Sequence, residues 1–330
     1  MRTPGKGIAM LCVLCVAACT QAIEDKAVTV EREKTVQRYD NFLAAASNGR
    51  QLASAGGNGV LVTSDDGGKS WTREILPSPS SVVAMSACPN GTFAALDFYR
   101  KVWIRDAQAR NWRLRRIEGN FNPLAITCDA RNLLWVVGSF STIVSSSDQG
   151  NSWNARPPGL DAILTSMQWV DADHGYIAGE FGTLLATDDG GATWVKQAGL
   201  PAELYPYSLV FTDTQHGWVS SLGGTILYTA DGGKTWAPQT NATAAPLYAL
   251  FHVGAQVFGV GGSGQVLKLE GDEWVSVTIT LQAPVDLVAV APLESRGLLV
   301  AGAAGTLQVV NLSASNSQLS SSVVTQRVQP

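Results

Sequence analysis

The sequence predicts an all-β fold, a seven-bladed β-propeller, from two features that repeat along the chain. Six tryptophans recur 41, 41, 41, 42 and 38 residues apart. They are Trp71, Trp112, Trp153, Trp194, Trp236 and Trp274. A tight turn, Gly-x-x-Gly in its best copies, begins at positions 56, 97, 138, 179, 221, 261 and 302. A constant period near 41 residues is typical of one supersecondary unit repeated in an array, and seven turns predict seven blades.

Four of these tryptophans end the same octapeptide, S/T-x-D-x-G-x-S/T-W, the Asp-box. We interpret each box as the turn between the two outer strands of a blade, in which the Asp carboxylate accepts hydrogen bonds from its own turn and Gly supplies a positive φ. The Trp then begins the outermost strand and buries its ring. The predicted structural residues are Asp66, Trp71, Asp148, Trp153, Asp189, Trp194, Asp231 and Trp236. In the second blade, residues 105–112 have lost the Asp and Gly of the box.

The strands of each blade follow the same period. Inner strands are expected at residues 82–88, 124–128, 163–170, 208–212, 247–252 and 286–291. The seventh blade has no tryptophan and therefore lacks an outermost strand. One period before Trp71, residues 28–32 alternate as an edge strand should, and we expect them to close the ring, because an open ring would expose two sheet edges. The propeller is then residues 28–312, and the Ser-rich tail at 313–330 is expected to be flexible.

The N-terminus has the pattern of a bacterial lipoprotein. Two basic residues precede a short apolar stretch, and residues 16–19 fit the lipobox, in which Cys19 is lipidated and becomes the new N-terminus. We expect periplasmic localisation with a lipid anchor in the outer membrane, because Thr20 and not an aspartate follows the cysteine. An ordinary secretory signal cleaved after Ala18 is the alternative. The predicted segments are a signal peptide at 1–18 and a lipidated tether at 19–27.

The net charge limits the possible kinds of partner, and the two remaining cysteines leave open whether the chain forms a disulfide. Without residues 1–18 the chain has 21 basic residues against 27 acidic ones, a net charge near −6, which argues against a nucleic-acid partner. Cys88 and Cys128 are 40 residues apart, at the ends of inner strands in adjacent blades. The periplasm would permit a disulfide. Neighbouring inner strands can nevertheless be too far apart for one, and we favour two buried free thiols.

Two stretches, at 171–194 and 213–236, carry the order D-x-x-H-G-W/Y, G-x-x-G-T and T-x-D-G-G-x-T-W. This order resembles the photosystem II stability/assembly factor family, the BNR-like propellers of chloroplasts and cyanobacteria that also have bacterial relatives outside photosynthesis. The resemblance covers nearly all of residues 28–312. It implies a monomeric scaffold that assembles or stabilises a membrane protein complex, a transporter being one such client, with a membrane-associated protein as its partner. It implies no catalytic residues.

Enzyme and metal readings find little support in the sequence. His174, His216 and His252 belong to turns or strand ends explained by the repeat, without a cluster of further ligands, so no metal or cofactor is expected. A glycosidase needs two carboxylates that face each other across a substrate, and the inner strands are dominated by Ala, Ser, Val and Leu. Asp97 and Glu180 lie in tight turns and could approach one another across a face. An Asp-box glycosidase or a carbohydrate-binding propeller is the alternative function.

The second blade concentrates positive charge in an otherwise acidic chain. Eight basic residues between positions 100 and 131 face three acidic ones. Arginine makes bidentate contacts and is enriched at interfaces, so this stretch predicts a docking surface for an acidic or anionic partner. A solvated outer strand that blocks edge pairing is the alternative. The predicted partner-binding residues are Arg100, Lys101, Arg105, Arg113, Arg115 and Arg116.

Overall fold

The computed structural model describes residues 26–109, 111–241, 243–281, 284–293, 297–312 and 321–322. The chain divides into two units, residues 1–34 and 35–330, each described here by itself. The described part of the first unit is one helix, α1 (Lys26–Glu33). No helix among the described residues has the length and apolar character needed to cross a membrane. The predicted signal peptide, Cys19 and most of the tether lie outside the described residues.

In the described part of the second unit, the strands form seven groups of four, each an antiparallel meander. We number these blades in chain order. Blades 1 and 2 are β1 (Phe42–Ser47), β2 (Leu52–Gly56), β3 (Val60–Ser64), β4 (Thr72–Ile75), β5 (Val82–Ala87), β6 (Phe93–Asp97), β7 (Lys101–Arg105) and β8 (Arg113–Arg116). Blades 3 and 4 are β9 (Pro123–Cys128), β10 (Leu134–Gly138), β11 (Ile143–Ser146), β12 (Asn154–Ala155), β13 (Leu164–Trp169), β14 (Gly175–Gly179), β15 (Thr183–Thr187) and β16 (Val195–Gln197).

The remaining blades follow the same order. They are β17 (Pro206–Phe211), β18 (Gly217–Ser221), β19 (Ile226–Thr229), β20 (Ala237–Asn241), β21 (Leu247–Val253), β22 (Gln256–Gly261), β23 (Val266–Glu270), β24 (Glu273–Ser276), β25 (Leu287–Leu293), β26 (Gly297–Gly302), β27 (Leu307–Asn311) and β28 (Ser321–Ser322). Blades 5 and 6 join into one eight-stranded sheet, because β20 pairs in parallel with β24. Short 3-10 turns, η1 (Gly57–Gly59) and η2 (Gly262–Gly264), link the middle strands of blades 1 and 6.

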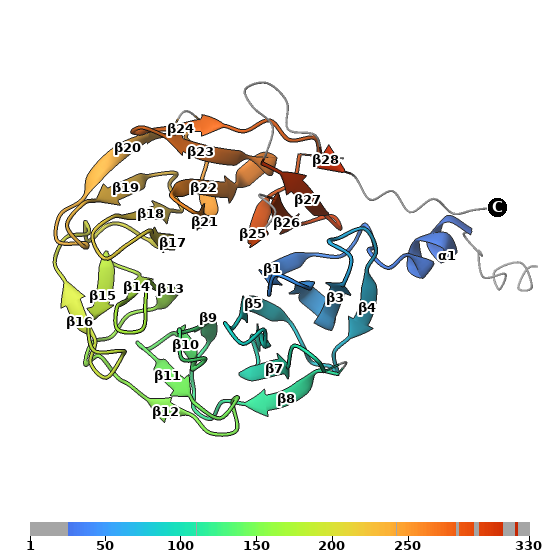
Figure 1. The fold of residues 1–330 in the computed structure, drawn as a ribbon, viewed down its shortest axis with the longest axis horizontal. Helices are drawn as coiled ribbons and strands as arrows, with labels where there is room; N and C mark the ends of the chain where they lie inside the picture. The colour runs from blue at the N-terminus through green and yellow to red at the C-terminus, as the bar shows by residue number, and fades with distance from the viewer. Residues whose placement is uncertain are drawn as a thin grey trace, which may run out of the picture. The chain divides into compact units, whose positions relative to one another are not determined.

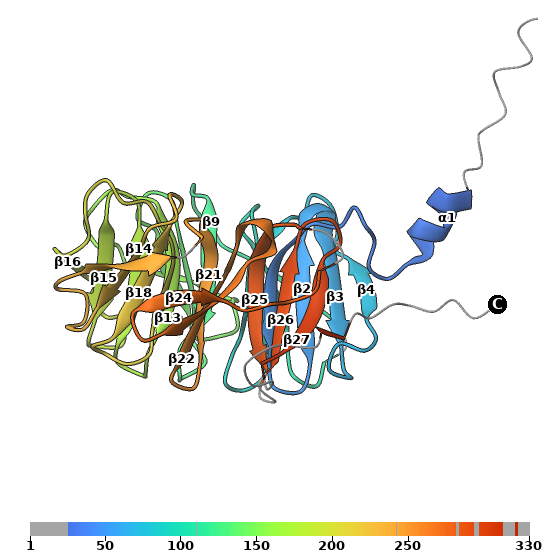
Figure 2. The ribbon, with the colours of Figure 1, turned by 90° about the horizontal axis from the view of Figure 1, so that it is seen from above.

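The first strand of each blade lines the centre of the propeller. Each of these inner strands packs against the next, and β1 packs against β25, so the ring is continuous (Figure 1). Figure 2 shows that the strands run between two faces of the ring, where the turns gather. The predicted all-β propeller is therefore confirmed, and each inner strand expected from the sequence overlaps an observed one.

The sequence pattern explains which strands are buried. The middle strands of the blades are short apolar runs enclosed on both faces by neighbouring sheets, such as Phe93–Asp97 in β6, where every residue is buried. Such continuous apolar runs are typical of strands covered on both sides. The outer strand β8 instead has exposed residues at both ends, Arg113 and Arg116, and half-buried residues between them. The core consequently consists of apolar clusters between adjacent blades, for example the one that contains Trp135, Ile177 and Trp194.

The predicted closure by an N-terminal strand is wrong. Residues 28–32 lie in α1, and the fourth strand of blade 7 is β28, which pairs antiparallel with β27. Five alternating residues are too few to distinguish a strand from a helix by pattern alone. The helix has a local stabilising contact, because Glu31 and Lys34 are three residues apart and form an ion pair of 2.7 Å. The tail predicted to be flexible thus contributes Ser321–Ser322 to the sheet.

Residues just before β1 nevertheless join the first blade to the last. The backbone N–H of Gly305, in the turn between β26 and β27, donates to the Asp40 carbonyl at 2.8 Å. A Cβ at Gly305 would lie 2.4 Å from the Gln37 carbonyl oxygen, so this approach requires glycine. The Asp40 carboxylate, almost fully buried, accepts two hydrogen bonds from Arg73 on β4, at 2.7 and 2.9 Å. Closure therefore uses a loop and a bidentate ion pair.

Candidate functional site

The Asp-box turns have the geometry that the sequence predicts. In blade 4 the Asp189 carboxylate accepts from the Thr193 backbone N–H at 2.9 Å and from the hydroxyls of Thr193 and Thr187 at 2.6 and 2.7 Å. The Thr193 hydroxyl and backbone N–H, followed by the Thr187 hydroxyl, lower the pKa of Asp189 to about 2. The same bonds lower the pKa to about 2 in the other three boxes, at Asp66, Asp148 and Asp231. Each carboxylate is therefore occupied within its own turn.

The Asp-box tryptophans pack to different depths. Trp194 is 8% exposed, and its ring lies 6.2 Å from that of Trp135 and 5.7 Å from that of Trp169. The other three, Trp71, Trp153 and Trp236, are half-buried. The outermost strand begins one residue after the tryptophan in each of these four blades. The boxes thus connect the turn to the packing between blades.

Two of the predicted partner-binding residues are buried, which corrects the predicted surface. The Lys101 ammonium donates to the Pro79 carbonyl and lies 3.4 Å from the Ser80 hydroxyl. Arg105 donates from Nε to the Ala109 carbonyl at 3.0 Å and lies over the Trp112 ring. Both belong to β7, one of the two middle strands of the blade, in which every residue is buried. The sequence alone does not show that these two side chains are buried, because long basic side chains can reach polar partners from a buried backbone.

The other four basic residues surround the outer side of blade 2. Arg100 lies in the turn between β6 and β7 and donates to the Phe121 carbonyl at 3.4 Å. Arg113 pairs with Asp106 at 2.7 Å and donates to the Gln149 side chain in the Asp-box turn of blade 3. Arg115 donates to the Gln149 carbonyl at 3.2 Å, and Arg116 is exposed. Strand β8 is therefore fastened to the next blade, and is more than a solvated edge.

A groove of about 440 Å³ lies between β8 and the Asp-box turn of blade 3. Its walls include the side chains of Arg115, Arg116, Glu118 and Trp153. Two guanidinium groups against one carboxylate give this groove a cationic character, and a guanidinium can hold a carboxylate by two hydrogen bonds. The structure thus brings Arg115 and Arg116 together at a concave site, which the sequence did not indicate.

Histidines and turn carboxylates are used within their own turns. His174 and His216 each lie 2.9 Å from the aspartate three residues earlier, Asp171 and Asp213. Burial opposes ionisation of Asp171, but the backbone N–H groups and the ring of His174 outweigh it and lower the pKa of this carboxyl group. Across the described parts of the chain, no group of three His, Cys, Asp or Glu side chains could hold a metal ion.

The two turn carboxylates considered for a glycosidase do not form a pair. Asp97 accepts from the backbone N–H groups of Ser81 and Tyr99, at 3.2 and 2.8 Å. Glu180 accepts from the backbone N–H of Ile163 at 2.9 Å. Each carboxylate therefore fastens its own turn to the segment that precedes the inner strand of the same blade.

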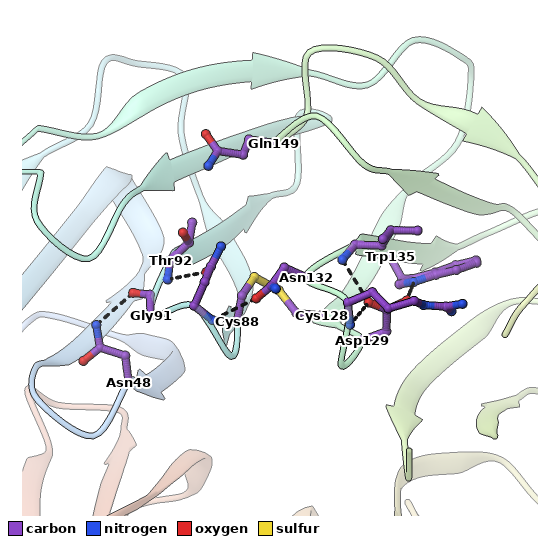
Figure 3. The surroundings of a disulfide bond; sticks show 12 residues. Asn48, Cys88, Gly91, Thr92, Cys128, Asp129, Asn132, Trp135 and Gln149 are labelled. Carbon is purple, nitrogen blue, oxygen red and sulfur yellow. Dashed lines mark hydrogen bonds and ion pairs between the residues drawn. A yellow bond between two sulfur atoms is a disulfide. The ribbon is translucent and has the colours of Figure 1, made fainter. Parts of the chain in front are cut away.

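Cys88 and Cys128 form a disulfide, which corrects the preference for free thiols (Figure 3). Their Cα atoms are 5.1 Å apart, inside the range that a disulfide requires. Inner strands converge around the centre of the ring, so the ends of β5 and β9 come closer together than strands of separate sheets usually do. The bond therefore ties blade 2 to blade 3. A depression of about 480 Å³ beside it is lined by Asn48, Asp129 and Trp169, among others.

One set of exposed side chains went unrecognised in the sequence. Tyr99, Phe140, Phe181 and Leu222 lie in the turns between the two middle strands of blades 2 to 5, and all four are exposed. Tyr99, Phe140 and Phe181 are each the second residue after the preceding strand, so the signal was present as an aromatic residue at one fixed position of three consecutive repeats. Leu222 lies one position earlier in the turn of blade 5, where Gly223 occupies the second position.

Fold and turns together define an Asp-box β-propeller, and sequence comparison shows which family its central repeats resemble. Residues 104–197 and 158–236 match the family described as Photosynthesis system II assembly factor YCF48. The Photosystem II assembly lipoprotein Ycf48 of Synechococcus sp. (strain CC9902) is 29% identical over 109 residues, 31% of this chain and 32% of that protein. The match therefore spans about a third of the curated relative. The predicted resemblance is confirmed: the central repeats of this chain are similar to photosystem II assembly factor-like propellers.

Solved structures agree with the fold. A structure of YCF48 bound to D1 peptide has a TM-score of 0.69 and 15% identity, and the match covers 84% of this chain and 93% of that one. YCF48 from Cyanidioschyzon merolae gives 0.65 and 16%, covering 83% and 97%. A catalytically inactive virginiamycin B lyase from Staphylococcus aureus, solved with quinupristin, gives 0.70 and 10%, covering 83% and 96%. At these identities the likeness shows the fold alone.

Proposed function

We propose that this protein is a non-catalytic assembly or accessory factor for a membrane protein complex. The observation that carries the proposal is the match of its central repeats to the YCF48 family, whose curated relative is a photosystem II assembly lipoprotein. A solved YCF48 is bound to D1 peptide, which supports a client recognised through a peptide segment. The client is a photosystem-like complex or, as the alternative, a transporter.

The groove beside β8 is the proposed contact for an anionic group of the client. Arg115 and Arg116 line it together with Trp153, which supplies an apolar wall. An arginine pair of this kind can hold a carboxylate by charge-assisted hydrogen bonds while an aromatic side chain packs against the adjoining chain. Arg113 does not belong to this contact, because the Asp106 carboxylate already neutralises its guanidinium. The Arg115 guanidinium donates to the carbonyls of Leu114 and Gln149 and forms no ion pair with a carboxylate of the described residues.

Lipidation at Cys19 would hold the monomeric propeller at the periplasmic side of a membrane. The curated relative is itself described as a lipoprotein. Metabolic labelling with a fatty acid tests this: the wild type should be labelled and found with the outer membrane, and Cys19→Ala should be neither labelled nor membrane-bound. An unlabelled wild type would contradict the anchor.

The enzymatic alternative has a specific basis and a specific weakness. Virginiamycin B lyase, an enzyme, shares the fold. Fold does not determine function, because function depends on a site. The turn carboxylates that a glycosidase would use, Asp97 and Glu180, are occupied by backbone N–H groups. We therefore propose a binding protein without catalytic, cofactor or metal residues.

Deleting the gene tests the assembly role directly. Native gel electrophoresis of membranes should show that one complex accumulates as incomplete subassemblies, and the wild-type chain should restore it. The variant Arg115→Glu/Arg116→Glu should still fold, because Arg116 is exposed and the half-buried Arg115 loses hydrogen bonds to two carbonyls, those of Leu114 and Gln149, at a cost of about 1–3 kcal/mol. Circular dichroism and thermal unfolding check this. The variant should fail to restore assembly, since like-charge repulsion at a binding site costs several kcal/mol.

The matched control is Lys196→Glu/Lys234→Glu, which makes the same charge change at two exposed lysines outside the groove. This variant should restore assembly as well as the wild type. If both double variants restored assembly equally well, the groove would not take part in binding the client. Normal membrane complexes in the deletion strain would contradict the proposed function itself.

A further inference from the structure

We name the four exposed apolar turn residues the turn arc: Tyr99, Phe140, Phe181 and Leu222. They are 46%, 67%, 67% and 49% exposed. The first three occupy the second position of their turns, which Asn58, Gly223, Ser263 and Ala304 occupy in the other blades, and Leu222 precedes Gly223 in blade 5. Four consecutive blades therefore present a large apolar group in this turn, and in three of them it stands at a position where the other blades have a polar or small residue.

The turns of the arc lie on one face of the propeller. The turns of blades 2, 3 and 4 are hydrogen-bonded to the connector that enters the inner strand of the same blade, by Phe98 N to Ser81 O at 2.9 Å, Ser139 N to Asn122 O at 3.0 Å and Glu180 N to Ile163 O at 2.9 Å. The turn of blade 5 joins the corresponding pair of middle strands, β18 and β19. Consecutive inner strands pack side by side around the ring. The four side chains consequently follow one another along a curved row from blade 2 to blade 5.

Backbone conformation indicates that these side chains are not there for packing. Phe140 and Phe181 adopt φ of 56° and 55°, a left-handed conformation that is costly for a bulky residue. Asn58, a residue that tolerates it better, has nearly the same φ. Both phenylalanines are two-thirds exposed, so burial within this chain does not offset that cost. Strain of this kind without internal compensation is typical of residues that bind something else.

Acidic residues accompany the arc. Asp161 and Glu203 are exposed, one in each connector that follows the outer strand of blades 3 and 4. Because these connectors bond to the turns of the arc, through the carbonyls of Ala162 and Leu204, each acid lies on the same face as an apolar turn residue. The surface thus combines a row of apolar side chains with two negative charges.

We propose that the turn arc binds an extended polypeptide segment that carries both apolar and basic side chains. The curved row fits an elongated chain, whose apolar groups would pack on the aromatic turns while its lysines or arginines face the acids. A bilayer surface fits less well, since anionic lipids attract basic residues and would repel these carboxylates. The inference rests on the proposed function only in taking a polypeptide as the ligand, and it concerns a different surface from the groove beside β8.

A synthetic peptide with alternating Phe and Lys residues separated by Gly is the probe, titrated into the purified full chain by fluorescence anisotropy. The test variant is Phe140→Gly/Phe181→Gly. Glycine adopts positive φ without steric cost, so the variant should melt at the same or a higher temperature than the wild type. It should bind the peptide at least about tenfold more weakly, as expected for loss of central aromatic contacts.

Two controls separate the arc from general surface apolarity. Ser263→Gly changes the same turn position in blade 6, and Ile75→Ser/Val195→Ser removes two exposed apolar residues from outer strands. Both should bind the peptide like the wild type. The double variant Asp161→Asn/Glu203→Gln should weaken binding and reduce its dependence on salt, and replacing Lys by Glu in the peptide should abolish binding.

The outcomes that would overturn the proposal are distinct. One is no binding of the Phe–Lys peptide to the wild type, and another is unchanged binding by a folded Phe140→Gly/Phe181→Gly variant. Vesicles of phosphatidylethanolamine and phosphatidylglycerol that bind the wild type but not this variant would assign the arc to a membrane. Because Arg115→Glu/Arg116→Glu lies outside the arc and should bind the peptide normally, a failure here is distinguishable from a failure of the proposed function.

Discussion

Blades 4 and 2 close their outer turns in different ways. In blade 4 the turn is closed by one of its own side chains, Asp189, which bonds to the hydroxyls and a backbone N–H of the same octapeptide. Blade 2 has lost the box, and Asp106 instead bonds to Arg113 on β8 and to Gln149 in the next blade. The outer turn of a blade can therefore be held by hydrogen bonds within its own repeat or by hydrogen bonds to the next blade.

Blade 2 is joined to blade 3 at both ends of the sheet. At the inner end, Cys88 is bonded to Cys128. At the outer end, Gln149 accepts from Arg113 and donates to Asp106. Where the local turn motif is missing, contacts between blades are present in its place. Both blades pack against blade 3, but the outer turn of blade 4 is held by its own carboxylate, whereas that of blade 2 is held by Arg113 together with Gln149 of blade 3.

The largest effect is expected at the Asp-box tryptophan of blade 4. Trp194→Ala should lower the free energy of unfolding by about 3–5 kcal/mol, because a nearly buried ring that packs on Trp135 and Trp169 is lost. Trp112→Ala, at the corresponding position of blade 2, should cost less, since Trp112 is only half-buried. Urea unfolding followed by circular dichroism measures both. Equal losses would show that the box has no particular role in packing.

Removing the disulfide should have the next largest effect. A cross-link between residues 40 positions apart restricts the unfolded chain, and its loss in Cys88→Ser/Cys128→Ser should cost about 2–4 kcal/mol. Thermal unfolding of the wild type with and without reductant provides the same comparison without mutation. The double variant should be insensitive to reductant. If the unfolding midpoint of the wild type did not change on reduction, the disulfide would not contribute to the stability of the protein.

How far the sequence predicts this molecule depends on whether a feature is local or shared between blades. The Asp-box bonds and the positions of the strands follow from single repeats, and both were predictable. The burial of Lys101 and Arg105 was not, because it depends on which strand of the blade they occupy and on partners such as Pro79 and Ala109. The groove at Arg115 and Arg116 likewise requires two blades to be placed side by side.

Closure of the ring was the other feature beyond the reach of the sequence. Residues 28–32 alternate as a strand would, but they form part of α1, and β28 supplies the last strand. The loop that does join blades 1 and 7 depends on Asp40, Arg73 and Gly305, which are far apart in the chain. No periodicity relates such residues, so only the folded chain shows that they meet.

Acid should weaken the Asp-box blades by a smaller amount. The pKa of Asp189 is lowered to about 2 from 3.8, so the ionised carboxylate favours the folded state at pH values above about 4. This contribution is lost as the pH falls through about 2. Asp189→Asn should therefore lower the thermal midpoint at pH 7 by less than Trp194→Ala does, and its difference from the wild type should shrink between pH 4 and pH 2. Asp188→Asn, an equal charge change at the adjacent exposed residue, should show no such trend.

The smallest effect is expected from the polar contacts that replace the box in blade 2. Arg113 and Asp106 are 44% and 35% exposed, so solvent screens their ion pair, and Arg113→Ala should cost less than about 1 kcal/mol. A double-mutant cycle between Arg113→Ala and Gln149→Ala, measured by urea unfolding at low and high salt, isolates the coupling between the two blades. A coupling near zero would mean that this outer contact adds nothing to the disulfide and the apolar packing that join blade 2 to blade 3. A coupling above 1 kcal/mol would mean that the outer contact replaces the missing Asp-box in energy as well as in position, because a pair this exposed reaches that value only when it acts as part of a network.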